Sequence, residues 1–119
     1  MEESLTALSE NEGVIACAFA QVSQGKLIAG KGKLEQIERS LTYALDIYES
    51  QGNILSALGS DPHTEDVMIS FNRQYHLIRP IPSDRDVVVY LVLNKSRSNL
   101  ARVRGALSNV ARQTSPKAP

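Results

Sequence analysis

The ten residues GVIACAFAQV, numbered 13–22, form a nearly unbroken apolar run, and this run decides the fold. A strand with one face in water would alternate apolar and polar residues, so the run predicts a strand buried on both faces. The segment DVVVYLVL, residues 86–93, is uniformly apolar in the same way. We therefore expect two central strands with other elements packed on both sides of them.

Three shorter segments supply the remaining strands. Turn residues at 23–25 allow residues 26–30 to return beside the first strand. The segments EDVMISF (65–71) and QYHLIRP (74–80) form a second hairpin. The two residues Asn72-Arg73 join them, and an Asn tolerates the positive φ that so tight a turn requires.

Helical spacing of apolar residues predicts three helices, at 3–10, 34–58 and 96–112. The order of elements is then helix, two strands, helix, three strands, helix. This order predicts an α/β fold with three layers, α/β/α, around a five-stranded antiparallel sheet. We expect one domain over residues 1–112, followed by a flexible tail at 113–119.

The composition of the 119 residues is ordinary for a globular protein, at 42% apolar and 22% charged. A net charge of zero gives no overall attraction for nucleic acid or an anionic membrane. No stretch approaches the roughly 20 apolar residues of a membrane span. The first residues are acidic without an apolar secretion segment, and the lone Cys17 can form no internal disulfide, so we expect a cytoplasmic protein.

The predicted helix at 34–58 carries two apolar surfaces. One stripe, sufficient to cover a sheet, contains Leu34, Ile37, Leu41, Ala44, Leu45, Tyr48 and Leu55. Tyr43, Ile47 and Ile54 lie well round the helix from it, with Ser40 and Gln51 in the gap. Leaving them in water forgoes about 1.5–3 kcal/mol for each large side chain. A second copy related by a two-fold axis would cover them; the alternative is a helix sunk more deeply into its own domain.

The strand at 65–71 supports the prediction of a dimer. Val67, Ile69 and Phe71 alternate with Met68 and Ser70, as expected of a strand with unlike faces. At the edge of the sheet, its unpaired backbone groups would pair with those of a second copy. We assign the dimer interface to Ser40, Tyr43, Ile47, Gln51, Ile54, Val67, Met68, Ile69, Ser70 and Phe71, and candidate partner-binding positions to Glu35, Arg39 and Asp46.

Two segments imitate nucleotide-binding motifs without the residues that the chemistry needs. GKLIAGKG (25–32) nearly matches the phosphate-binding loop, but Gly32 has no hydroxyl to hold magnesium. In VLNKSR (92–97), Arg97 stands where a guanine-binding motif requires a carboxylate acceptor. No set of residues combines a nucleophile, a base and an orienting group, and no spacing suggests metal ligands. We expect no enzyme activity, metal or cofactor.

The segment EGVIACAFAQVSQGKLIA (12–29) resembles the opening hairpin of Roadblock (dynein light-chain) domains. FNRQYHLIRPIPSDRDVVVYLVLNKSRSNLARVRGAL (71–107) is similar to the carboxy-terminal half of short bacterial members. The resemblance implies a Roadblock/profilin-like fold, with the long helix on one face of the sheet and the terminal helices on the other. Family members pair through the long helix and the third strand. Many serve as platforms for Ras-like small GTPases, and bacterial members include activators of motility GTPases.

The resulting hypothesis is a non-catalytic homodimer that regulates or scaffolds other proteins, with a small GTPase as a candidate partner. One alternative is a small-molecule sensor, which requires a concave pocket. Another is a nucleic-acid binder, because the chain after Asp86 has no acid but carries Lys95, Arg97, Arg102, Arg104, Arg112 and Lys117. The last helix lacks interleaved aromatic residues, so we expect no nucleic-acid partner and place it beside the acidic first helix.

Overall fold

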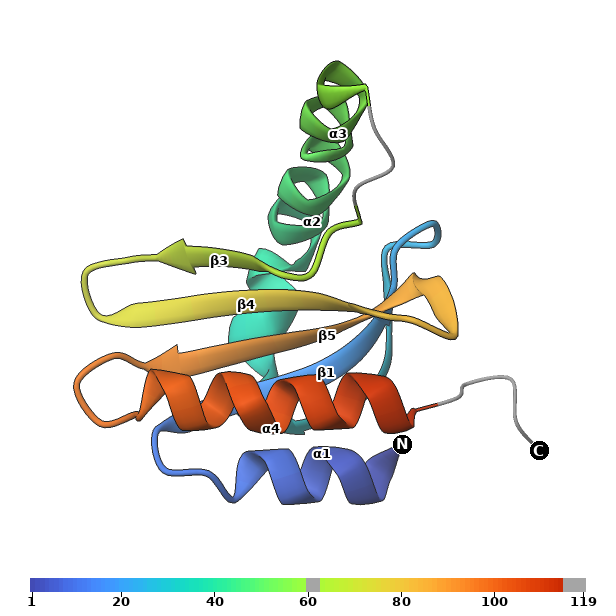
Figure 1. Ribbon diagram of the computed structural model, residues 1–119. Coiled ribbons are helices and arrows are strands. Elements are labelled where there is room, and N and C mark those ends of the chain that lie inside the picture. The colour runs from blue at the N-terminus through green and yellow to red at the C-terminus, as the bar shows by residue number, and fades with distance from the viewer. Residues whose placement is uncertain (60–62, 115–119) are drawn as a thin grey trace.

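A five-stranded antiparallel sheet runs through the middle of the molecule, with helices on both faces (Figure 1). The computed structural model describes residues 1–59 and 63–114. The elements are α1 (Glu2–Ser9), β1 (Val14–Gln21), β2 (Lys26–Gly32), α2 (Leu34–Ser50), α3 (Gly52–Leu58), β3 (Val67–Ser70), β4 (Gln74–Ile81), β5 (Asp84–Asn94) and α4 (Leu100–Gln113). The strand order across the sheet is β2-β1-β5-β4-β3. The predicted three-layer α/β/α architecture is confirmed.

The two apolar runs, β1 and β5, are central strands because other elements cover both of their faces. β1 pairs with β2 on one side and β5 on the other, and β5 pairs in turn with β4. Cys17 and Phe19 of β1 belong to the core beneath α1 and α4. Ala16, Ala18 and Ala20 belong to the core beneath α2. These three small side chains leave room for α2 to lie close to the sheet.

The face that carries Phe19 is covered by α1 and α4, which lie side by side (Figure 1). Leu5 of α1 and Leu107 of α4 are fully buried there. The α4 helix begins at Asn99, whose side chain accepts a hydrogen bond from the Arg102 backbone N–H at 3.1 Å. The acidic first helix therefore lies beside the basic last helix, as predicted, although no ion pair joins these two described helices.

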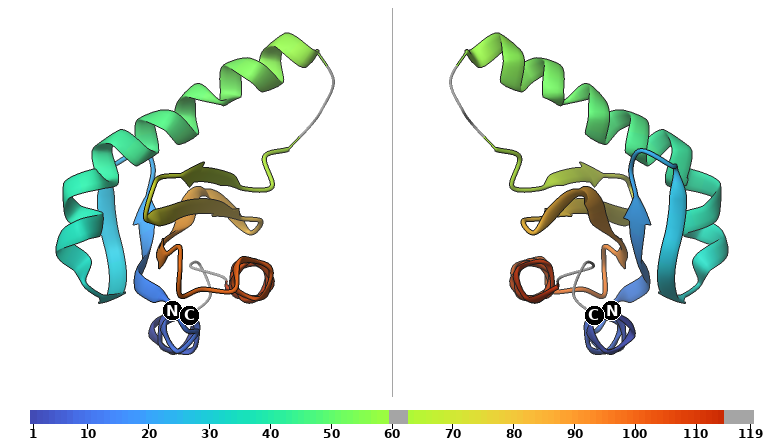
Figure 2. Two further views of the ribbon diagram at one scale, coloured as in Figure 1. Left: turned by 90° about the vertical axis from the view of Figure 1, so that its left-hand side faces the viewer. Right: turned by 90° about the vertical axis from the view of Figure 1, so that its right-hand side faces the viewer.

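The opposite face of the sheet is covered by α2, and α3 continues along nearly the same axis (Figure 2). The sequence predicts one helix over 34–58, and the structure divides it at Gln51, just before Gly52. Gln51 between the two parts keeps helical angles, φ −65° and ψ −18°, so the direction is preserved. Gly59 ends α3 with a left-handed φ of 72°. No residue of α3 is buried, and the helix projects past β3 (Figure 1).

The turn between β3 and β4 differs from the prediction, because Asn72 does not have a positive φ. The last residues that β3 pairs with β4 are Ser70 and Tyr75. Gln74 already belongs to β4, and the Phe71 backbone N–H donates to the Gln74 carbonyl at 2.8 Å, so Asn72 and Arg73 form the connection that the sequence predicts. The difference is confined to the backbone of these two residues, neither of which is left-handed.

The first two residues of the predicted tail, Gln113 and Thr114, are folded instead. Gln113 still belongs to α4, and Thr114 is buried, with its carbonyl accepting a hydrogen bond from the Ser83 hydroxyl at 2.9 Å. Both residues are therefore part of the folded domain. Residues 115–119 lie outside the described part of the chain.

Candidate protein-binding interface

The α2 helix is attached to the sheet by the stripe that the sequence predicts. The fully covered members of that stripe are Ile37, Leu41, Ala44, Leu45 and Tyr48. Leu34 and Leu55, at its two ends, are only partly buried. One face of the helix therefore suffices to hold it on its own domain.

A second apolar stripe follows another side of α2 and α3, and water reaches it. The exposed fractions are 72% for Tyr43, 45% for Ile47, 63% for Ile54 and 65% for Leu58. We call these four residues the second stripe. Tyr43, Ile47 and Ile54 are predicted from the sequence, whereas Leu58 was missed. It follows Ile54 by one helical turn, so extending the same spacing would have found it.

Ser40 lies on this side of α2 but is bound to its own sheet. Its hydroxyl donates to the Gln36 carbonyl at 2.8 Å and lies 2.6 Å from the Tyr90 hydroxyl. The Gln36 side-chain carbonyl accepts a hydrogen bond from Gln74 Nε2 at 2.9 Å. This side of the helix is thus attached to β4 and β5 where it begins. From Tyr43 onward, its apolar residues are exposed.

His76 of β4 extends the same polar network. Its Nδ1 lies 2.7 Å from the Tyr90 hydroxyl, and its Nε2 lies 2.9 Å from Gln74 Oε1. Burial lowers the pKa of the imidazole, because removing water disfavours the charged form. The ring of Phe71 meets the His76 ring edge-on at 5.0 Å between centroids, and Phe71 is half exposed. An apolar residue thus lies between this network and the solvent.

β3 forms one edge of the sheet, which is the condition for its pairing with a second copy. Val67 and Ile69 pair with residues of β4 that face α2, and both are partly buried. Met68 and Ser70 point to the other face and are exposed. Ser70 Oγ accepts a hydrogen bond from Lys95 Nζ at 2.9 Å. The outer backbone of β3 has no strand beside it within the described residues.

The remaining predicted positions occupy the rim of this surface. Gln51 is partly buried, and its side-chain oxygen accepts a hydrogen bond from the Thr64 hydroxyl. Glu35, Arg39 and Asp46 are exposed. Asp46 also lines a shallow hollow of about 350 Å³ together with Ile47 and Ile54 of the second stripe. A charged side chain therefore lies next to the apolar residues of the second stripe.

Cys17 and the segment Lys26–Gly32 are parts of the sheet. Burial raises the pKa of the Cys17 thiol to about 11, which keeps it protonated. The segment that imitates a phosphate loop forms β2, a strand, so it does not present a loop of backbone N–H groups. Within the described residues, no group of three His, Cys, Asp or Glu side chains could hold a metal ion. No helix of the same residues has both the length and the apolar character to cross a membrane.

No protein-family model and no curated protein matches the sequence. Solved structures do match, over most of both chains. Myxococcus xanthus MglB matches 92% of this chain and 86% of its own, with a TM-score of 0.77 at 13% identity. A Roadblock/LC7 domain from Streptomyces avermitilis matches 94% of this chain and 92% of its own, with a TM-score of 0.75 at 11% identity. MglB in a tetrameric arrangement matches 93% of this chain and 82% of its own, with a TM-score of 0.76 at 14% identity.

These likenesses define the class of the protein: the chain has the Roadblock fold. Within that class, it is similar to MglB along nearly its whole length. The likeness concerns the arrangement of helices and strands, which agrees with the resemblance that the sequence segments carry.

Proposed function

We propose that this chain is a cytoplasmic member of the Roadblock family that forms a homodimer and acts without catalysis, as a regulator or scaffold for other proteins. The observation that carries the proposal is the exposed second stripe beside the edge strand β3. The Roadblock fold of the chain supports it.

A second copy is the simplest cover for this surface. Each large side chain of the second stripe that is buried contributes about 1.5–3 kcal/mol. A two-fold axis would bring the stripe of one copy against that of its partner, and it would place the two β3 edges together in antiparallel pairing. Because the stripe and the strand lie on the same side of the molecule, one interface of roughly 1,200–2,000 Å² would use both.

Sedimentation velocity over a range of micromolar concentrations tests the dimer. The variant Ile47→Asp places a charge in the second stripe. We therefore expect the dissociation constant of the dimer to rise at least about a hundredfold. Thr42→Asp is the matched control, since Thr42 is also exposed on α2 but lies on a different side. The control should dimerise like the unmodified protein.

Two outcomes would contradict the proposed dimer. One is a monomer of the unmodified chain at high micromolar concentration. The other is an Ile47→Asp variant that sediments as the unmodified protein does. Circular dichroism of each variant separates loss of assembly from loss of folding.

The finer part of the proposal is that the dimer binds a Ras-like small GTPase. The resemblance of the sequence to Roadblock domains that serve as GTPase platforms supports it, as does the structural similarity to MglB. Glu35, Arg39 and Asp46 are the proposed contacts, because they are charged residues exposed on α2.

Calorimetric titration with purified Ras-like small GTPases of the same organism tests this partner. Each GTPase would be loaded with GDP or with a non-hydrolysable GTP analogue. We expect one nucleotide state to bind, and Arg39→Glu to weaken binding at least about tenfold through charge repulsion. Lys26→Glu is the control, because Lys26 is exposed on β2. Binding in neither state, or an equal loss in the control, would contradict the proposal.

A further inference from the structure

Two adjoining hollows at one end of the sheet are lined by cationic side chains and by no carboxylate. Lys33 and Arg97 line the first, which has a volume of about 380 Å³. Arg73 and Lys95 line the second, of about 450 Å³. Asn94 lines both hollows, so they form one continuous surface. The sequence does not predict this cluster, because the four cations come from three separate segments.

Three of these cations have no partner in the described structure. The side chains of Lys33, Arg73 and Arg97 make no hydrogen bond and no ion pair there. Arg104 shows the contrast, because its guanidinium binds the Asp66 carboxylate at 2.8 Å. The unpaired cations are therefore available to a ligand that supplies negative charge.

The fourth cation is fixed in position. Lys95 Nζ donates to Ser70 Oγ at 2.9 Å and to the Phe71 carbonyl at 3.0 Å, and it lies 5.0 Å from the centre of the Tyr75 ring. The backbone N–H of Lys95 donates to the Arg73 carbonyl at 2.9 Å. This bond ties the β3–β4 loop, which carries Arg73, to the end of β5.

Further backbone hydrogen bonds hold the other segments in the same frame. Asn94 N donates to the Gly13 carbonyl at 2.7 Å, which joins the end of β5 to the start of β1. Lys33 N donates to the Ile15 carbonyl at 3.0 Å, which joins the start of α2 to β1. Arg97 N donates back to the Asn94 carbonyl at 3.3 Å. The backbone that carries the free cations is thus fixed before any ligand arrives, which lowers the entropic cost of binding.

We propose that these two hollows dock a short acidic segment of a partner protein, with its carboxylates beside Lys33, Arg73 and Arg97. This inference names a class of partner, and it rests on the protein-binding part of the proposed function. Both hollows are shallow surface depressions, whereas a small molecule needs a site that buries most of its surface. A short extended segment can instead lie across both and meet cations in each.

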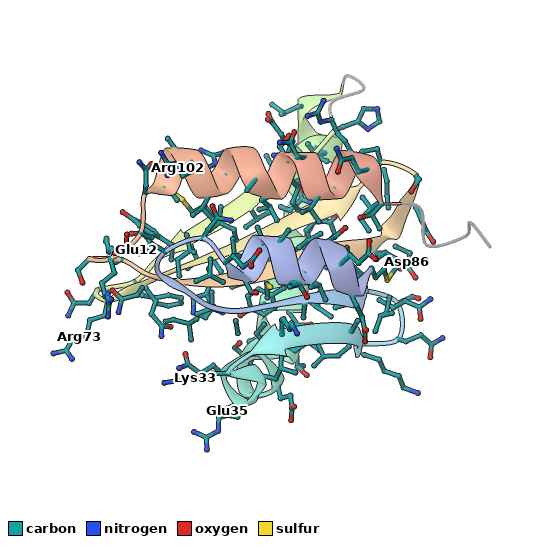
Figure 3. All side chains as sticks on the ribbon, turned by 90° about the horizontal axis from the view of Figure 1, so that it is seen from below. Glu12, Lys33, Glu35, Arg73, Asp86 and Arg102 are labelled. Atoms are coloured by element: carbon teal, nitrogen blue, oxygen red, sulfur yellow. The ribbon has the colours of Figure 1, made fainter. Side chains whose placement is uncertain are left out.

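The surroundings of the hollows favour a short segment over a long polyanion. Glu12 and Glu35 lie at the same end of the molecule as Lys33 and Arg73, whereas Asp86 lies at the opposite end (Figure 3). A nucleic acid that extended beyond the hollows would meet Glu12 and Glu35 and be repelled. A segment of a few residues would contact only the cations.

Fluorescence anisotropy with a short labelled peptide that alternates Glu and Ser tests the inference. We expect binding that weakens with added salt, and at least about tenfold weaker binding by the Arg73→Ala/Arg97→Ala double variant. The matched control is Arg102→Ala/Arg112→Ala, which removes two exposed arginines of α4 and the same net charge. The control should bind within about twofold of the unmodified protein.

Three results would overturn the inference: an equal loss in the control, no binding of the peptide, or tighter binding of inorganic phosphate or a single-stranded oligonucleotide at the same arginines. Sedimentation of the same samples separates this inference from the proposed dimer. A dimer that fails to bind the peptide overturns only the docking surface, whereas a monomer that binds it overturns only the dimer.

Discussion

On the face of the sheet that α1 and α4 cover, Leu5 and Leu107 are fully buried. On the other face, α2 is held by one stripe, while Tyr43 and Ile54 are exposed and Phe71 is half exposed beside β3. Both faces contain similar apolar residues. They differ in how much of that apolar surface the chain covers by itself.

In the proposed dimer, α2 has two separate structural tasks. The stripe around Leu41 and Leu45 holds the helix on its own domain, and it is buried without any help. The second stripe lies on another side of the helix and is exposed to water. Substitutions in the second stripe would therefore test assembly of the proposed dimer, whereas substitutions beneath α1 and α4 would test folding of the single chain.

The largest effect is expected on the closed face, from Leu107→Ala. Removing this fully buried side chain should lower the free energy of unfolding by about 2–5 kcal/mol, through lost burial and the cavity left behind. Urea unfolding at a low and a high protein concentration measures it. The loss should be the same at both, and a loss that depended on concentration would remove the distinction between the two faces.

A smaller effect on folding, but a clear one on assembly, is expected from Tyr43→Ser. Because Tyr43 is largely exposed, the free energy of unfolding of the single chain should change by no more than about 0.5 kcal/mol. The dissociation constant of the dimer, measured by sedimentation at a series of dilutions, should rise at least about tenfold. A variant that is less stable as a monomer would instead place Tyr43 in the fold of its own chain.

A weaker, pH-dependent effect is expected from His76. Burial holds the pKa of the folded imidazole below the value of 6.5 that applies to the unfolded chain. Below that value the unfolded chain binds more protons, so the contribution to stability is present above pH 6.5 and is lost as the pH falls through the folded pKa.

The variant His76→Gln should show a smaller loss of stability on acidification than the unmodified protein. Urea unfolding at about pH 7.5 and about pH 5.5 measures the difference, because a His titrates between these values. Identical pH dependence in the two proteins would show that the imidazole is not desolvated in solution.

The smallest effect is expected from chemical labelling of Cys17, because this measurement needs no substitution. Its pKa of about 11 keeps the thiol protonated near pH 8, and its Sγ lies 3.5 Å from the Leu5 carbonyl beneath α1. Mass spectrometry after treatment with a thiol reagent should show slow labelling that accelerates in urea. Fast labelling without urea would mean that α1 opens and that this face is not closed.

The central strands were predictable because burial on both faces requires an uninterrupted run of apolar residues. The apolar runs at 13–22 and 86–93 are central strands, and the alternating residues at 65–71 include an edge strand. The exposed positions of the second stripe were also predictable, since a helix places residues at fixed angles. Both arguments depend on neighbours within one element, which is the information that a sequence contains.

Features that depend on distant segments were not predictable. Ser40 is spaced like an interface residue, yet its hydroxyl contacts Tyr90 of β5. The cationic hollows likewise combine Lys33, Arg73 and Arg97, which come together only when β1, β4 and β5 align. Neither pattern follows from a local period, because the register between strands determines which side chains meet.

In the proposed dimer, the alanines of β1 have a consequence for recognition between copies. The α2 helix packs on three small side chains, those of Ala16, Ala18 and Ala20. Their size sets the distance and the angle between this helix and the sheet. A bulkier residue in that row would tilt the helix and re-aim Tyr43 and Ile47. Two related chains that differ only in this row would then present mismatched surfaces, and compatibility between them would depend on side chains that no partner ever touches.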